Sequence, residues 1–167
     1  AKYLNETRNF DGTVVLIFQP AEEEGAGGKA MVDDGMMDRW GVQEVYGMHN
    51  MPGLPVGQFA VRPGALMASV DTFDVTVTGK GGHAAVPHDA IDTNLVAAQM
   101  VVALNSITSR NVDPLKSAVV TVTTMLSDTD SYNVIPQTVN LKGTVRTLDN
   151  PIRDLIEERV TAILEAT

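Results

Sequence analysis

Apolar residues in the second half of the chain follow strand and helix spacings in turn. Apolar and polar residues alternate in segments 71–80, 117–126 and 138–148, which predicts β-strands with one buried face. Segment 92–110 and the segment after Asn150 have helical spacing, and Asn150 followed by Pro151 is typical of a helix start. The order β-α-β-β-α predicts an α+β unit with helices on one face of an antiparallel sheet. This is a ferredoxin-like arrangement without its last strand.

A different pattern occupies the first part of the chain. The run TVVLIF at 13–18 is apolar without alternation, which predicts a strand buried on both faces of a parallel sheet. Segment 28–40 predicts a short amphipathic helix with Met31, Val32 and Met36 inward, and segment 42–48 predicts a second strand. A right-handed crossover would make these strands parallel, so the residues after each strand would share the sheet edge where α/β proteins bind ligands.

The segment between these regions, 51–64, is rich in proline and glycine and predicts an irregular connection. We expect a domain boundary near it, between residues 68 and 69. Residues 1–68 then form an α/β portion and residues 69–167 the α+β unit.

Composition narrows the possible partners. The net charge of −9 disfavours nucleic acid and anionic membrane surfaces, and the lack of cysteine excludes thiolate metal sites and disulfides. No apolar run approaches the ~20 residues of a membrane span, and the first residues lack a signal-peptide layout. We therefore expect a soluble, cytoplasmic protein that binds neither nucleic acid nor membranes.

Three consecutive carboxylates, Glu22, Glu23 and Glu24, follow the first predicted strand. Adjacent anions at the end of a buried strand are costly unless a cation lies among them, and a divalent metal would supply that charge. One glutamate could then bind the metal while its neighbour takes a proton from an acidified water. The alternative is a solvated helix start, where acidic residues complement the helix dipole.

The glycines after these glutamates allow a rival interpretation. Gly25, Gly27 and Ala30 have the G-x-G-x-x-A spacing of a dinucleotide-binding turn. The preceding glutamates would repel a pyrophosphate, so we disfavour this interpretation. A phosphate-binding P-loop is excluded, because Glu23 stands where its first glycine belongs and Ala30 follows Lys29.

His49 directly follows the second predicted strand and could reach the same sheet edge as the glutamates. Imidazole and carboxylate groups together suit zinc, manganese or cobalt. The alternative is a packed or surface histidine.

Polar residues of the second region offer further candidates. His83 and His88 lie in the glycine-rich segment TGKGGHAAVPHDA, where a histidine could donate a hydrogen bond to a developing oxyanion. A purely structural turn is the alternative, and we favour it for His88. Asn133 could be a hydrogen-bond donor or a turn residue. Arg146 could bind a carboxylate or decorate a polar sheet face.

The chain resembles the aminoacylase and carboxypeptidase family of metal-dependent amidohydrolases, most closely its hippurate hydrolase and auxin-conjugate amidohydrolase branch. Successive blocks along the whole chain carry the resemblance: VVLIFQPAEEEGAGGKAMVDDG, YGMHNMPGLPVGQFAVRPG, VTGKGGHAAVPHDAIDT, SRNVDPLKSAVVTVT, NVIPQTVNLKGTVRT and IRDLIEERV. The resemblance implies that residues 1–68 are part of a metal-binding catalytic domain. It implies that residues 69–167 are a truncated lid domain that also forms a homodimer.

The resemblance also implies roles for the candidate residues of the catalytic domain. Glu22 matches the general base, and Glu23 and His49 match ligands of one or two divalent metal ions, zinc, manganese or cobalt. Glu24 stands where many relatives have glycine and is assigned no role.

In the lid, His83 matches the histidine that reaches across the dimer to stabilise the oxyanion in the partner's site. Asn133 and Arg146 match positions that bind the polar backbone and the carboxylate of the substrate. The implied reaction is hydrolysis of the amide bond of N-acyl amino acids.

The resemblance has gaps, since other metal ligands of the family and the last lid strand have no counterpart in the chain. We therefore expect an internal fragment of a longer enzyme that is inactive in isolation. The alternative function is a non-catalytic dimerisation module.

Overall fold

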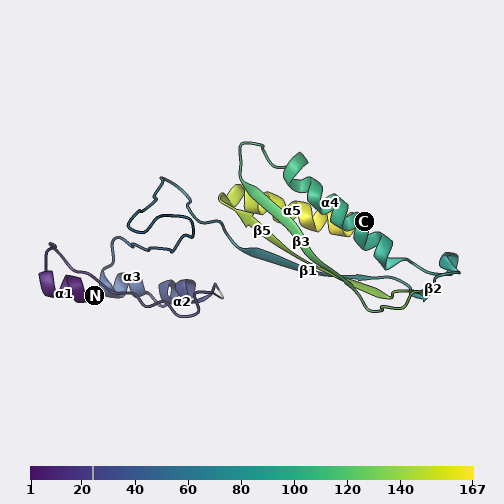
Figure 1. Ribbon diagram of the computed structural model, residues 1–167, viewed down its shortest axis with the longest axis horizontal. Helices are drawn as coiled ribbons and strands as arrows, with labels where there is room; N and C mark the ends of the chain where they lie inside the picture. The colour runs from purple at the N-terminus through teal and green to yellow at the C-terminus, as the bar shows by residue number, and fades with distance from the viewer. Residues whose placement is uncertain (24) are drawn as a thin grey trace. The chain divides into compact units, whose positions relative to one another are not determined.

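The computed structural model describes residues 1–23 and 25–167, which form two compact units, 1–58 and 59–167 (Figure 1). The division falls between Gln58 and Phe59, inside the proline- and glycine-rich connection and before the boundary predicted at 68/69. Among the described residues, no helix combines the length and apolar character that a membrane crossing requires.

The second unit contains five main elements in the order expected from the sequence (Figure 1). They are β1 (Asp71–Thr78), α4 (Thr93–Arg110), β3 (Ala118–Ser127), β5 (Thr138–Thr147) and α5 (Asn150–Ala166). The three strands form an antiparallel sheet in the order β1-β5-β3, so β5 is central. Two short strands, β2 (Gly82–His83) and β4 (Val134–Ile135), pair separately, and a 3-10 turn, η1 (Pro87–Asp89), follows β2.

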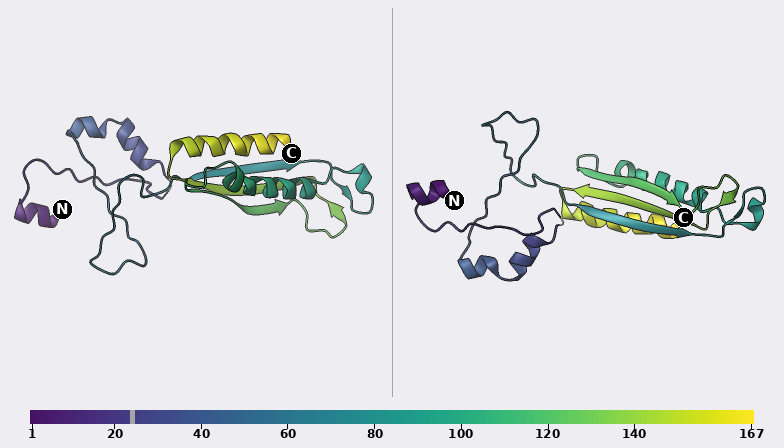
Figure 2. Two further views of the ribbon diagram at one scale, coloured as in Figure 1. Left: turned by 90° about the horizontal axis from the view of Figure 1, so that it is seen from above. Right: turned by 60° about the horizontal axis from the view of Figure 1, so that its bottom comes forward.

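Both long helices cover one face of this sheet (Figure 2). Alternate residues of β5 point into the core, and Val139 and Leu141 are fully buried there. Leu104 of α4 and Ile156 of α5 pack in the same apolar layer. The intervening residues of β5, which include Arg146, face away from the helices and make the other side of the sheet polar.

The middle of the sheet contains an aromatic side chain above a glycine. Phe73 of β1 lies directly opposite Gly143 of β5, and a Cβ atom on Gly143 would come within 2.6 Å of three atoms of the Phe73 ring. The register between β3 and β5 shifts at this level, between Val122 and Thr124. Glycine is therefore required here because a ring occupies the space that a side chain would fill.

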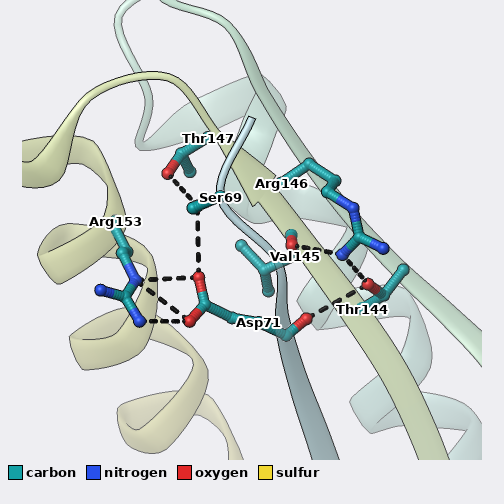
Figure 3. A network of polar contacts seen from close by, with 7 residues as sticks. All are labelled: Ser69, Asp71, Thr144, Val145, Arg146, Thr147 and Arg153. Carbon is teal, nitrogen blue, oxygen red and sulfur yellow. Dashed lines mark hydrogen bonds and ion pairs between the residues drawn. The ribbon is translucent and has the colours of Figure 1, made fainter. Parts of the chain in front are cut away.

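A polar network ties the start of β1 to α5 and to the end of β5 (Figure 3). Arg153 Nε donates to both carboxylate oxygens of Asp71, at 3.0 and 2.9 Å. The backbone N–H of Ser69 donates to Thr147 O at 2.7 Å, and the two hydroxyl groups lie 2.9 Å apart. Hydrogen bonding from Arg153 lowers the pKa of Asp71 below its ordinary value, against a smaller opposing effect of burial.

The helix starts of this unit are close to the predicted ones. Asp92 caps α4, and its carboxylate accepts from Leu95 N at 3.2 Å. The N-cap of α5 is Asp149 rather than the predicted Asn150. Asp149 makes no capping bond, because its carboxylate pairs with Lys116 at 2.6 Å.

The first unit contains three short helices, α1 (Lys2–Thr7), α2 (Gly27–Asp33) and α3 (Met36–Trp40). The single helix predicted over 28–40 is wrong, because Gly35 takes a left-handed φ of 76° and separates α2 from α3. Val32, expected inward, is 54% exposed, whereas Met31 and Met36 are partly buried.

The strands predicted at 13–18 and 42–48 are also absent from the described part of this unit. A strand exists only when its backbone pairs with another strand, and neither segment has such a partner here. Apolar side chains such as Phe18, 83% exposed, therefore stay in contact with solvent. Segment 13–18 instead lines a hollow of about 420 Å³ together with Met31, Met36 and Trp40.

Candidate functional site

The predicted base and ligand, Glu22 and Glu23, lie in a tight turn that leads into α2. The residue before them, Ala21, has a positive φ of 48°, and Gly25 N donates to Glu22 O at 3.3 Å. At the end of the turn, Gly27 packs directly against the carbonyl oxygen of Pro20, where any Cβ atom would overlap that oxygen. The two glycines are thus explained by backbone geometry, since Gly25 has a left-handed φ of 74° and Gly27 lies against the Pro20 carbonyl. Both carboxylates are exposed, and Glu24 lies outside the described residues.

His49, the other predicted ligand, is exposed in the irregular segment after residue 42. Its Nδ1 atom lies 2.5 Å from the backbone oxygen of Asn50. Within residues 1–23 and 25–167, no three side chains of histidine, cysteine, aspartate or glutamate are grouped so that they could hold a metal ion. Glu23 and His49 are donors of the right chemical type for a divalent metal, but two donors do not complete a coordination shell.

His83 is held in a defined orientation at the end of the second unit. It belongs to β2 and pairs with Val134 of β4. Its Nδ1 atom accepts a hydrogen bond from the backbone N–H of Ala85 at 3.1 Å. A neutral imidazole that accepts at Nδ1 carries its proton on Nε2. The exposed ring can therefore donate an Nε2–H bond to a ligand.

Asn133 lies beside His83 through the same strand pairing. The backbone N–H of Ala84 donates to Asn133 O at 2.9 Å, so the histidine-bearing and asparagine-bearing segments are joined. Both residues are exposed. His88 lies further on, in the 3-10 turn η1, where its side chain is also exposed. The structure thus brings together two of the three lid residues predicted for the site.

Arg146, the third, lies near the other end of the sheet. It is near the C-terminal end of β5, opposite Val119 of β3, whereas β2 and β4 lie beyond the start of β5 (Figure 1). From Thr138 to Arg146 the strand spans roughly 27 Å at ~3.4 Å per residue. The guanidinium donates to Val145 O at 2.8 Å and to the Thr144 hydroxyl. One small substrate therefore cannot contact both Arg146 and His83 of the same chain.

Two polar residues near His83 were not identified from the sequence. Thr93, 1% exposed, donates from Oγ1 to Pro136 O at 2.9 Å and so ties the start of α4 to the segment after β4. Gln137 uses its side-chain amide to hold the glycine-rich turn before His83. The sequence shows Gln137 as a polar residue between Pro136 and β5, but its hydrogen-bond partners lie more than fifty residues away in sequence.

The exposed carboxylates of Glu22 and Glu23 are suited to proton transfer, and the imidazole N–H of His83 is suited to a negatively charged oxygen. The sequence profile of Peptidase family M20/M25/M40 matches residues 1–156, and the chain belongs to this family.

Curated relatives agree with this assignment. The chain is 46% identical over 154 residues to the N-acetyl-L-cysteine deacetylase of Bacillus subtilis, covering 92% of this chain and 36% of the relative. It is 44% identical over 163 residues to the hippurate hydrolase of Campylobacter jejuni, covering 98% of this chain and 42% of the relative. The chain thus spans about two fifths of the length of these relatives.

Solved structures of similar sequence share the fold. A structure from methicillin-resistant Staphylococcus aureus matches with a TM-score of 0.88 at 34% identity, over 98% of this chain and 44% of that one. The Bacillus subtilis YXEP protein, a dinuclear metal-binding peptidase from the M20 family, matches with a TM-score of 0.63 at 35% identity, over 96% of this chain and 41% of that one.

Proposed function

We propose that the protein containing this chain hydrolyses the amide bond of N-acyl amino acids with the help of divalent metal ions. The observation that carries the proposal is the orientation of His83, whose Nδ1 atom is occupied by Ala85 N–H and whose Nε2–H is free to donate. The names of the relatives support the substrate class, since a hippurate hydrolase and an N-acetyl-L-cysteine deacetylase both act on N-acyl amino acids.

In this proposal the chain's own residues divide the work. Glu22 takes a proton from the attacking water and delivers it to the leaving amine nitrogen. Glu23 and His49 would hold metal, together with ligands from the rest of the protein, and bound metal would supply Lewis acidity that lowers the pKa of water. His83 donates from Nε2 to the oxygen that becomes negatively charged. Arg146 binds the substrate carboxylate, and Asn133 its polar backbone.

We further propose that the second unit is a ferredoxin-like lid that forms a homodimer. The roughly 27 Å between the start of β5 and Arg146 supports a site that two copies complete, with His83 and Asn133 from one chain and Arg146 from its partner. Two features of the lid suit a second copy: β3 is an edge strand, and α4 exposes Leu95 and Val102, which are 58% and 74% exposed.

Substitution Glu22→Gln in the full-length protein tests the assignment of the base. We expect hippurate hydrolysis to fall at least 100-fold, the lower range for loss of a general base, with the metal content unchanged. Glu44→Gln is the matched control, because it makes the same change in the same unit on a residue whose side chain accepts a hydrogen bond from the Tyr46 hydroxyl. Near-normal turnover in Glu22→Gln would assign the base elsewhere.

The same edge strand and exposed helix face favour the second candidate function, a dimerisation module without catalysis. Sedimentation with metal titration separates the two functions. Stoichiometric metal uptake and turnover by the full-length protein support the hydrolase, whereas a dimer with neither supports the module.

A further inference from the structure

The glycine-rich turn 79–82, which leads into His83, is bound on both sides of its centre by the backbone and side chain of Gln137. Gly79 N donates to Gln137 O at 3.0 Å. Gly81 N donates to the side-chain Oε1 atom at 2.9 Å, and Nε2 donates back to Gly79 O at 2.5 Å. The amide can point only this way, because the Gly81 N–H must donate and the Gly79 carbonyl must accept.

The other hydrogen bonds of this turn are made by backbone groups. Its glycines lie against backbone, since a Cβ on Gly79 would come 2.7 Å from Ile91 O and one on Gly81 3.0 Å from Ile135 O. Glycine permits that approach but also leaves the chain free to adopt many other conformations. A backbone bridge of two hydrogen bonds joins the centre of the turn to Ile91: Lys80 N donates to Ile91 O at 3.3 Å, and Ile91 N donates to Lys80 O at 2.9 Å. The Gln137 amide adds bonds on both sides of that bridge.

We propose that Gln137 is a positioning residue for His83. The bonds to Gly79 and Gly81 fix where β2 begins, and His83 is the second residue of β2. Without the amide, the Nε2–H group of His83 would spend less time where the negative oxygen develops, and the rate would fall with that fraction. This inference rests on the proposed role of His83 in amide hydrolysis.

A double-mutant cycle in the full-length protein tests the inference, with hippurate as substrate. We expect Gln137→Ala to lower kcat roughly tenfold with KM nearly unchanged, because the bonds position the donor rather than bind substrate. Asn140→Ala is the matched control. Asn140 lies three residues further on, in β5, and its loss removes one hydrogen bond from Thr76, 2.9 Å long. This variant should leave kcat within about twofold of the wild type.

The decisive measurement is Gln137→Ala in a His83→Ala background, where we expect no further loss of kcat. A tenfold loss in both backgrounds would mean that Gln137 acts through general stability and would overturn the inference. So would a normal kcat for Gln137→Ala alone. Should the alanine variant not fold, Gln137→Glu serves the same cycle, because it keeps an acceptor for Gly81 and sets an anionic oxygen against Gly79 O.

The single variant His83→Ala separates the two proposals. If it retains full activity, the role of His83 is refuted and the inference falls with it. If it loses activity while Gln137 and His83 behave additively, the role of His83 stands and only the inference about Gln137 fails.

Discussion

Substitution Gly143→Ala should destabilise the sheet of the second unit through a single added methyl group. The new Cβ atom would lie within 2.6 Å of three atoms of the Phe73 ring, well inside contact distance. The ring must move to make room for the methyl group, and because Phe73 packs against the apolar core, that movement disturbs the packing of the core. Overpacking of this kind costs about 1–3 kcal/mol.

Urea unfolding followed by far-UV circular dichroism would measure the effect. With an m-value of about 2 kcal/mol/M, a loss of about 2 kcal/mol lowers the midpoint by about 1 M. Tryptophan fluorescence would be the wrong probe, because Trp40 is the only tryptophan and belongs to the first unit.

A second background makes the prediction specific to the ring. In Phe73→Leu protein the clash is relieved, and Gly143→Ala should stabilise by about 0.5–1 kcal/mol, since glycine within a strand is less favourable than alanine. The sign of the effect thus depends on residue 73. An unchanged or raised midpoint for Gly143→Ala in the presence of Phe73 would refute the reasoning.

Two further predictions concern polar contacts of the second unit. Asp71→Asn should destabilise the fold at neutral pH, because Arg153 stabilises the charged carboxylate and depresses the pKa of Asp71. The difference in unfolding free energy from the wild type should shrink as the pH falls below about 3.9 towards the folded-state pKa. A difference that does not depend on pH in unfolding titrations would contradict this prediction. Thr93→Val should cost about 1–3 kcal/mol in urea unfolding, because the buried Pro136 carbonyl loses its donor, and an unchanged midpoint would show that another group satisfies it.

The elements of the second unit could be predicted because their partners lie within the same stretch of chain. Alternation in β5 matches its buried positions, and the helical spacing of segment 92–110 matches α4. The first unit shows the limit. The run at 13–18 has the composition of a buried strand, but composition cannot supply the neighbouring strand that would complete its hydrogen bonds.

The candidate site divides in the same way. The glycines around His83 indicated a turn, and the family resemblance singled out His83 and Asn133 as candidates. Their proximity depends on β2 and β4, which have two residues each and are too short for any periodicity to show. The amide of Gln137 reaches a turn 56 residues away in sequence, and no local pattern encodes such a contact.

The number of residues in β5 determines which side chains lie on the polar side of the sheet. Arg146 and the residues near His83 keep their separation and their faces only while the count of residues along β5 stays fixed. Because side chains alternate across a strand, one inserted residue would send Arg146 to the helix-covered side and expose Val145 or its neighbours to water. Relatives should therefore tolerate exchanges of side chains along this strand far more readily than a single insertion or deletion within it.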